Sequence, residues 1–286
     1  MERAPEKCIL CGVQKRVLLI EKEPWKVYRC PNCGLGFLDP RPSWEEIKNL
    51  YHREYFSERY DRGLDPDSPE FRKRLNGEKH RIQFIKTMKG TGRLLDIGCG
   101  YGYFLFACRK ERYDVMGLDV SEWAGQYAVK ELGLPAKIGQ IGEVDFPRQS
   151  FDVISMWHFL EHSQDPDLVI HRAKSWLKED GILVIDVPNY EGTDASYRLE
   201  EWDGWSLPYH LWHFTYQSMI MLLQKHGFEI AKYKDYRSEV IKEKLSPVPL
   251  LRPFARLIAK LYSGTSFAVI AIQNPELMSG KQHGFC

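Results

Sequence analysis

Residues 94–102 read LLDIGCGYG, an apolar run that leads into three glycines at alternate positions. This pattern predicts a strand that enters a tight loop, with a helix beginning near Tyr103. Glycine lets the backbone turn sharply and approach a ligand that a Cβ atom would push away, and the start of a helix offers unpaired N–H groups. The stretch therefore predicts a nucleoside-binding loop.

Two acidic residues indicate which nucleoside is bound. A dinucleotide-binding loop would read Gly-x-Gly-x-x-Gly, but this chain has tyrosine where the third glycine would stand. Asp96 precedes the first glycine by two residues, and a second strand over residues 114–119 ends in Asp119. Asp119 follows Gly98 at the distance that one βαβ unit needs, and its carboxylate can accept both hydroxyls of a ribose. The carboxylates favour a nucleoside site over a purely structural turn.

At these residues the chain resembles the class I S-adenosylmethionine-dependent methyltransferases, whose first motif is an acidic residue followed by Gly-x-Gly-x-Gly. Residues 139–147, 150–162 and 181–189 resemble the third, fourth and fifth strand regions of that family. The similarity spans roughly residues 91–235. It implies that the glycine loop holds the methionine part of the cofactor and that Asp119 holds its ribose.

The resemblance also implies the remaining cofactor contacts. Gln140 and Ile141 would lie beside the adenine, and Trp157 and His158 would face the reactive sulfonium. The full set of implied cofactor-binding residues is Asp96, Gly98, Cys99, Gly100, Gly102, Asp119, Val120, Gln140, Ile141, Trp157 and His158.

The implied fold is α/β: a Rossmann-like, doubly wound, seven-stranded and mostly parallel sheet, preceded by a zinc ribbon. Residues 151–156 and 182–187 are short apolar runs with polar, Gly or Pro boundaries, as expected for parallel strands buried on both faces. We expect a zinc ribbon over 1–41, a helical linker or lid over 42–90, an S-adenosylmethionine-binding domain over 91–275 and a C-terminal tail over 276–286.

Composition excludes several protein classes. The 286 residues carry 40 Lys and Arg against 39 Asp and Glu, a net charge of +1, which argues against a dedicated nucleic-acid-binding protein. No apolar run approaches the roughly 18 residues of a membrane span, and the N-terminus lacks the apolar segment of a signal peptide. We therefore expect a cytoplasmic protein without a membrane span.

Four cysteines form two C-x-x-C pairs, Cys8 with Cys11 and Cys30 with Cys33. This spacing indicates a structural Zn²⁺ site, in which four thiolates saturate a tetrahedral ion and leave no open position for catalysis. Two disulfides are disfavoured in a reducing cytoplasm, and a redox dithiol would need only one pair. The ribbon is moderately basic, so nucleic-acid binding remains an alternative. We favour a small module that needs the zinc ion to fold and that packs on the neighbouring domain.

The ribbon together with the downstream motifs resembles a subset of bacterial methyltransferases that often act on sugars or on cell-surface polysaccharide precursors. This resemblance implies a small-molecule or saccharide substrate.

The region between residues 190 and 212 is rich in aromatic side chains: Tyr190, Tyr197, Trp202, Trp205, Tyr209 and Trp212. At the carboxyl edge of a parallel sheet, such rings either stack on a substrate or pack a loop against the domain, and both alternatives stay open. Because the acceptor site is expected at this edge, we place the information on the acceptor between residues 190 and 215.

Periodicity predicts the other elements. They are a hairpin over 17–20 and 25–29, helices over 44–51, 70–88 and 217–226, strands over 228–233 and 266–272, and an exposed linker or lid over 54–70. The apolar and basic residues over 253–262 favour an ordinary covering helix, although a membrane-surface helix, and with it peripheral membrane contact, stays open.

Residues 158–162 read HFLEH and match the His-x-x-Glu-His pattern of inverted zinc peptidases. A peptidase needs both histidines on one face of a helix, whereas His158 falls at the end of a predicted buried strand. The match is therefore interpreted as coincidental and does not indicate a zinc peptidase.

Methyl transfer to a hydroxyl is helped by a general base within hydrogen-bond reach, and histidine has a suitable pKa. The candidates are His210, His213 and His158, in that order. Oxygen, nitrogen and carbon acceptors stay open, with oxygen favoured. The alternative hypothesis is a binding or scaffold protein with a non-catalytic methyltransferase-like domain and a ribbon that docks nucleic acid or protein.

Overall fold

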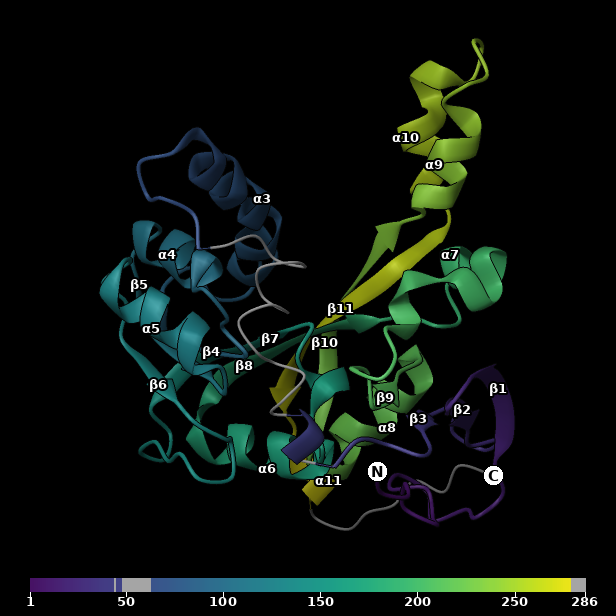
Figure 1. The fold of residues 1–286 in the computed structure, drawn as a ribbon. Coiled ribbons are helices and arrows are strands. Elements are labelled where there is room, and N and C mark those ends of the chain that lie inside the picture. Colours follow the sequence, from purple (N-terminus) through teal and green to yellow (C-terminus); the bar gives the residue numbers. More distant parts are fainter. Residues whose placement is uncertain (44, 48–62, 279–286) are drawn as a thin grey trace.

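The structure is a computed structural model that describes residues 1–43, 45–47 and 63–278. Its centre is a seven-stranded sheet with the order β10-β11-β8-β7-β4-β5-β6 (Figure 1). The strands are β4 (Gly92–Ile97), β5 (Tyr113–Asp119), β6 (Ala136–Ile138), β7 (Phe151–Trp157), β8 (Leu177–Pro188), β10 (Phe228–Arg237) and β11 (Ser263–Gln273). Only β11 runs antiparallel to its neighbours, so the predicted mostly parallel seven-stranded sheet is confirmed.

Helices cover both faces of this sheet, which explains the unbroken apolar runs in its central strands. One face packs against α3 (Pro69–Lys86), α4 (Tyr103–Lys110) and α5 (Glu122–Lys130). The other packs against α6 (Pro166–Trp176) and α8 (Tyr216–Lys225). Neighbouring residues of β4 point to opposite faces, so Leu94 joins the first core and Leu95 the second.

Side-chain caps begin most of these helices. Ser68, Ser121, Asp165 and Thr215 each accept a hydrogen bond from a backbone N–H in the first turn of α3, α5, α6 and α8. The shorter elements are α7 (Thr193–Arg198), α9 (Glu239–Leu245), α10 (Ala255–Ala259), α11 (Pro275–Met278), η1 (Leu160–His162), η2 (Leu199–Glu201), η3 (Asp203–Trp205) and η4 (Arg252–Phe254). None of the helices within the described ranges is long and apolar enough to cross a bilayer.

A second sheet joins the N-terminal ribbon to the rest of the chain. It has the order β1-β2-β3-β9, with β1 (Val17–Lys22), β2 (Trp25–Arg29), β3 (Gly36–Leu38) and β9 (Trp212–His213). The predicted hairpin is therefore confirmed, and β9 adds to the ribbon a strand from far along the chain. Its register pairs Phe37 with Trp212.

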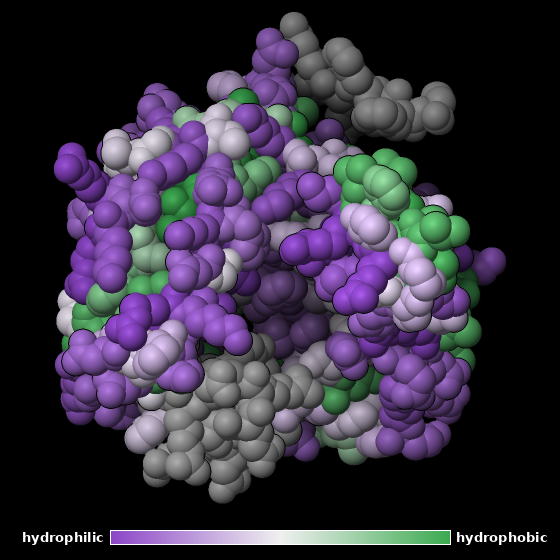
Figure 2. All heavy atoms as spheres, turned by 90° about the horizontal axis from the view of Figure 1, so that it is seen from above, coloured by the Kyte–Doolittle hydropathy of each residue, from purple (hydrophilic) through white to green (hydrophobic). Residues whose placement is uncertain are grey.

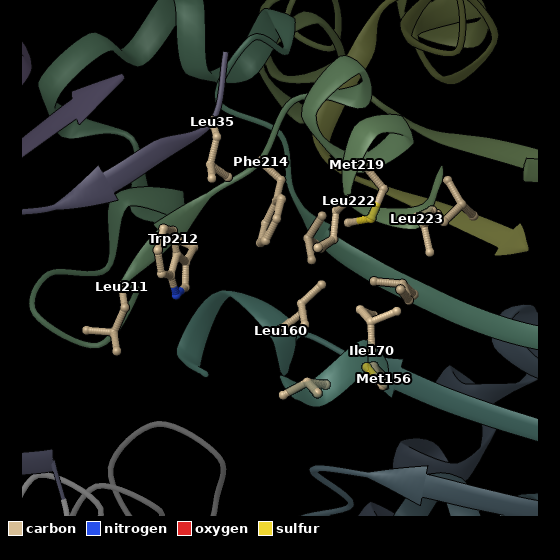
Figure 3. Packing of buried hydrophobic residues seen from close by; sticks show 14 of the residues in the cluster. Leu35, Met156, Leu160, Ile170, Leu211, Trp212, Phe214, Met219, Leu222 and Leu223 are labelled. Carbon is tan, nitrogen blue, oxygen red and sulfur yellow. The ribbon is translucent and has the colours of Figure 1, made fainter. Parts of the chain in front are cut away.

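The core beneath this sheet is continuous with that of the central sheet. Figure 3 shows Leu35 of the ribbon beside Trp212 and Phe214, with Leu222 of α8 and Leu160 of η1 on the other side of these rings. Because the ribbon shares this core, it packs as part of the fold. This agrees with the prediction of a module that packs on its neighbour.

Several predicted boundaries are wrong in detail. The third parallel strand is β6 at Ala136–Ile138, so it precedes the region over 139–147. Helix α3 ends at Lys86, before the predicted end at 88, and β8, β10 and β11 are longer than predicted. Most of the predicted helix over 44–51, and the predicted linker up to residue 62, lie outside the described residues.

The segment over 253–262 does not cover the domain. It forms η4 and α10, which together with α9 project away from the sheet between β10 and β11 (Figure 1). The favoured prediction of a covering helix is therefore wrong, because α10 packs mainly on α9 and leaves most of its large apolar side chains exposed.

Candidate active site

The glycine loop connects β4 to α4. Gly98, Gly100 and Gly102 have φ angles of 78°, 50° and 77°, in the left-handed region that favours glycine. A Cβ atom on Gly98 would lie 2.5 Å from the ring of Phe159, whereas a Cβ atom on Gly100 would meet no described atom within 4 Å. The lack of a side chain at Gly98 therefore lets the Phe159 ring pack against the loop. The backbone at Gly100 borders open space that a ligand can enter.

Both predicted carboxylates lie beside this loop. Asp119 is buried, and its Oδ2 and Oδ1 accept hydrogen bonds from the backbone N–H groups of Gly100 (2.7 Å) and Ser121 (2.8 Å). Each oxygen keeps a second lone pair for a ligand hydroxyl. Asp96 accepts a hydrogen bond from the Ser155 hydroxyl at 2.6 Å, and burial raises the pKa of Asp96 to about 7. The loop and Asp119 thus form one hydrogen-bonded unit, and Asp96 lies near the end of the strand that enters the loop.

This unit forms part of a pocket with a volume of about 470 Å³ at the carboxyl ends of the central strands. Every residue predicted to bind the cofactor lines the pocket except Gly102, which packs against Leu134 and Ala128. Ligand sites at this edge are typical of open α/β sheets.

The sequence did not reveal that α3 supplies charged groups to the same pocket. Glu78 is buried, and its carboxylate lies 2.7 Å from the guanidinium of Arg74 and 2.9 Å from that of Arg81. The guanidinium of Arg81 also lies over the ring of Trp157, at 4.9 Å from its centre. The spacing of these residues predicts ion pairs on a helix, but spacing alone does not show which face meets a pocket.

His158 lies in the pocket wall, directly after β7. Strand pairing aligns Trp157 with Asp186 of β8, so the next residue, His158, lies beside that carboxylate. Nδ1 of His158 donates a hydrogen bond to Oε1 of Glu161 at 3.2 Å, and Nε2 lies 3.5 Å from Oδ1 of Asp186. The histidine side chain is 39% exposed, whereas both carboxylates are buried.

These two carboxylates set the protonation of His158. Burial lowers the pKa of the imidazole, but the charge of Asp186 and the hydrogen bond to Glu161 outweigh burial and raise the pKa above its ordinary value. The φ angle of His158 is 53°, an uncommon conformation for a residue with a side chain. Backbone strain of this kind is concentrated at functional sites.

His210 and His213 are buried, and neither is among the described residues that line the pocket. Nδ1 of His210 donates to the carbonyl oxygen of Gly204 at 2.8 Å. Burial lowers the pKa of His210 well below its ordinary value and lowers the pKa of His213 to about 3. Of the three candidate bases, His158 is therefore the one that lines the pocket as it is described.

The aromatic side chains between residues 190 and 212 mostly pack inside the protein. Trp202, Trp205 and Trp212 are buried, and the Trp212 indole donates a hydrogen bond to the carbonyl oxygen of Ser163 at 2.8 Å. None of the aromatic residues of this region lines the pocket as it is described over 1–43, 45–47 and 63–278. These contacts support the alternative in which the aromatic rings pack the loop against the domain. Helix α3 supplies pocket residues that we had expected from residues 190–215.

Comparison with known proteins identifies the domain. A family model described as "Methyltransferase domain" matches residues 68–233, more than half of the chain. The chain belongs to the methyltransferase domain family. The predicted class of enzyme is thereby confirmed.

Curated relatives of this methyltransferase include ubiquinone biosynthesis O-methyltransferases. That of Actinobacillus pleuropneumoniae serotype 7 is 34% identical over 123 residues, which cover 38% of this chain and 52% of the relative. That of Bradyrhizobium diazoefficiens is 25% identical over 165 residues, covering 51% and 65%. The chain thus spans about half the length of the first curated relatives it matches.

Solved structures support the same fold for the methyltransferase. A SAM-dependent methyltransferase from Archaeoglobus fulgidus superimposes with a TM-score of 0.52 and 23% identity, covering 71% of this chain and 96% of that one. A possible histamine N-methyltransferase from Thermotoga maritima gives a TM-score of 0.54 and 18% identity, covering 79% and 98%. At these identities the likeness concerns the fold alone.

The four cysteines of the ribbon converge. Sγ of Cys8 lies 3.4 Å from that of Cys33, and Sγ of Cys11 lies 3.4 Å from that of Cys30. All four sulfurs lie within 4.8 Å of one another, and none belongs to a disulfide. A tetrahedral zinc ion with bonds of about 2.3 Å separates its sulfurs by about 3.8 Å, so the donor set fits this ion.

A second group of ligand-type side chains lies at the edge of the pocket. One oxygen of Glu161 and one ring nitrogen each of His162 and His210 lie within 4.8 Å of one another, a set of donors that divalent metals accept. This is not a peptidase centre, because His158 follows a strand in a left-handed conformation and His162 ends the short helix η1. The interpretation of the HFLEH match as coincidental agrees with this geometry.

Proposed function

We propose that this methyltransferase transfers the methyl group of S-adenosylmethionine to a hydroxyl oxygen of a small molecule, with His158 as the general base. The observation that carries the proposal is the position of His158, which is exposed to the pocket and backed by the buried carboxylates of Glu161 and Asp186. The names of the curated relatives support oxygen as the acceptor atom.

S-Adenosylmethionine, when bound, supplies an activated methyl group on a sulfonium. Asp119 and the backbone at Gly100 hold the nucleoside, and the pocket keeps the acceptor close, aligned and shielded from water. With Nδ1 of His158 donating to Glu161, Nε2 carries the lone pair that takes the acceptor proton. Oδ1 of Asp186 is buried 3.5 Å from Nε2 without a hydrogen-bond partner among the described residues, so its charge would stabilise the imidazolium that forms.

The lining of the pocket bears on the class of acceptor. Aromatic rings of Tyr101, Tyr103, Phe104 and Trp157 lie in its wall together with the ion pairs of α3. Flat rings stack well on a planar acceptor, and a phenolic hydroxyl loses its proton more readily than a sugar hydroxyl. These features favour an aromatic hydroxyl, and a saccharide or polysaccharide precursor is the second candidate.

Transfer of label from methyl-labelled cofactor tests the proposal. The full chain is incubated with a catechol, a phenol, an aromatic amine, a free sugar and a sugar nucleotide. We expect label on the catechol or phenol, which would be lost in an Asp119→Ala variant. Label on the sugars alone would replace the aromatic acceptor by the saccharide, and label only on an amine would contradict oxygen transfer. A complete lack of transfer to these probes and to cell extract, despite cofactor binding, would favour the non-catalytic alternative.

Asp119→Ala is expected to weaken binding of S-adenosylhomocysteine by about a hundredfold to ten-thousandfold, because two charge-assisted hydrogen bonds of about 1.5–3 kcal/mol each are lost. Isothermal titration calorimetry measures the change. Asp114→Ala is the matched control, since Asp114 lies on the same strand but is 76% exposed. Undiminished affinity of Asp119→Ala would contradict the assignment of Asp119 to the ribose.

Gly100→Ala is expected to weaken binding of the same ligand by about tenfold or more, because its methyl group would point into the space that the ligand occupies. The φ angle of 50° lies where alanine costs about 1–2 kcal/mol of stability. Gly98→Ala, in contrast, would collide with Phe159 and should lower the melting temperature further. Equal affinities of Gly100→Ala and wild type would show that the ligand does not approach this backbone.

The four cysteines, in the same proposal, hold one structural zinc ion. Four thiolates complete a tetrahedral shell and leave no position for a substrate, so the ion has no direct part in methyl transfer. Its role is to stabilise the ribbon that pairs through β3 with β9.

A further inference from the structure

A helical arm interrupts the edge hairpin between β10 and β11. It comprises residues 238–262, including α9, η4 and α10, and projects away from the sheet (Figure 1). The carboxylate of buried Asp194 fixes its base by accepting hydrogen bonds from the backbone of Glu239 (3.1 Å), the backbone of Val240 (3.2 Å) and the hydroxyl of Thr265 (3.0 Å). The arm is therefore an anchored part of the fold.

The burial pattern of the arm is the reverse of that in an ordinary packed helix. Ala255 and Ala259, which are small, are 2% and 0% exposed, whereas Leu250, Leu257 and Leu261 are 85%, 64% and 81% exposed. Further large apolar side chains are exposed at Val248, Leu251, Phe254 and Tyr262. Contiguous apolar surface of this kind marks a site of interaction.

The acidic residues of the arm, Glu239 and Glu243, lie on α9 and form ion pairs with Lys242, Arg237 and Arg198, whereas the segment that carries the exposed apolar side chains has only positive charges. Residues 246–262 contain Arg252, Arg256 and Lys260 but neither aspartate nor glutamate. The three cations are spaced four residues apart, which aligns them along one side of a helical segment. Figure 2, which views the molecule from above, shows a hydrophobic area over the arm with hydrophilic residues beside it.

We propose that the arm docks the protein on an anionic lipid surface. Its exposed leucines and Phe254 enter the boundary between headgroups and acyl chains, and its three cations contact the lipid phosphates. Leucine and phenylalanine beside lysine and arginine are the composition of helices that lie in a membrane interface. The long side chains of Arg and Lys can extend to the phosphates while their stems lie along the apolar layer.

A second copy of the chain fits this surface less well. A symmetric contact between two arms would bring the same surface of each copy together. The three cations of residues 246–262 would then face the same three cations of the other copy, and this segment has no acidic residue to offset them. An anionic membrane offers negative charge and an apolar layer together. The inference is independent of the identity of the methyl acceptor.

Vesicle flotation with the full chain tests the inference. The probes are phosphatidylcholine vesicles with and without phosphatidylglycerol, and we expect the wild type to float only with the anionic vesicles. Changing Arg252, Arg256 and Lys260 to glutamine should weaken partitioning by about a hundredfold, since each cation contributes roughly a factor of five near an anionic surface. Changing Leu250, Leu257 and Leu261 to serine should abolish flotation.

A matched control changes three exposed lysines elsewhere, Lys22, Lys79 and Lys130, to glutamine. This variant should float like the wild type, and all variants should bind S-adenosylhomocysteine with unchanged affinity, which shows that they fold. The inference is overturned if the wild type does not float with anionic vesicles or if both arm variants float as it does. It is also overturned if sedimentation analysis shows a dimer that only the arm variants disrupt while vesicles stay unbound.

Discussion

His158→Asn is expected to lower kcat by about a hundredfold to ten-thousandfold, the range that general-base catalysis contributes. Asparagine is the suitable replacement because it tolerates the left-handed backbone of this position, where φ is 53°. The affinity for S-adenosylhomocysteine should change far less than kcat. His171→Asn is the control, because His171 is exposed and is not among the described pocket residues.

The pH dependence of kcat/KM distinguishes a base from a binding residue. A base acts in its neutral form, so the rate should fall as the pH drops through the pKa of His158, which lies above the ordinary value for histidine. Asp186→Asn removes the charge that raises this pKa, so the acid limb should move to lower pH. Asparagine can still accept the hydrogen bond that the Tyr236 hydroxyl donates at 2.6 Å. An unshifted acid limb would contradict the role of His158.

Cys33→Ser is expected to abolish zinc binding and to lower the melting temperature by about 10 °C or more. Zinc in small cysteine sites contributes about 10–16 kcal/mol of binding free energy, and a loss of even 5 kcal/mol would shift the transition this far. Elemental analysis should give one zinc ion per wild-type chain and none in the variant. Scanning calorimetry measures the stability.

The structure predicts that loss of the zinc ion also destabilises residues outside the ribbon. Strand β3 pairs with β9, and the Tyr190 hydroxyl donates a hydrogen bond to the carbonyl oxygen of Gly34, so loss of the metal should also loosen residues 190–215. Hydrogen exchange would show this as faster exchange at Trp212 and His213. Cys108→Ala, which changes a buried cysteine outside the cluster, should retain zinc. Full stability of Cys33→Ser without zinc would contradict a structural role for the ion.

The predicted site residues that the structure brings together at the pocket have signals that are local in the chain. The glycine loop, Asp96 and Asp119 lie within two strands and one helix, and the spacing of glycines reports directly on the backbone that they must adopt. The C-x-x-C pairs are similar, because each pair places two sulfurs on one short turn.

The parts that were missed depend on how distant segments pack. His158 was ranked below His210 and His213 because sequence could not show that β7 and β8 align it with Asp186 while burial removes the other two from the pocket. In the same way, the polar pattern of α3 gave no indication that Glu78 faces the pocket. The direction of a side chain from a mostly polar helix is set by the neighbours of that helix.

Sequence by itself determined the family, the glycine loop with its carboxylates, and the cysteine cluster, because these features depend on residues close together in the chain. Tertiary structure alone decided that His158, unlike His210 and His213, lines the pocket, that β9 joins the ribbon to the domain, and that the helix over 253–262 projects from the sheet. These outcomes depend on strand register and on which apolar surfaces find a partner, and both are settled only when distant segments pack together.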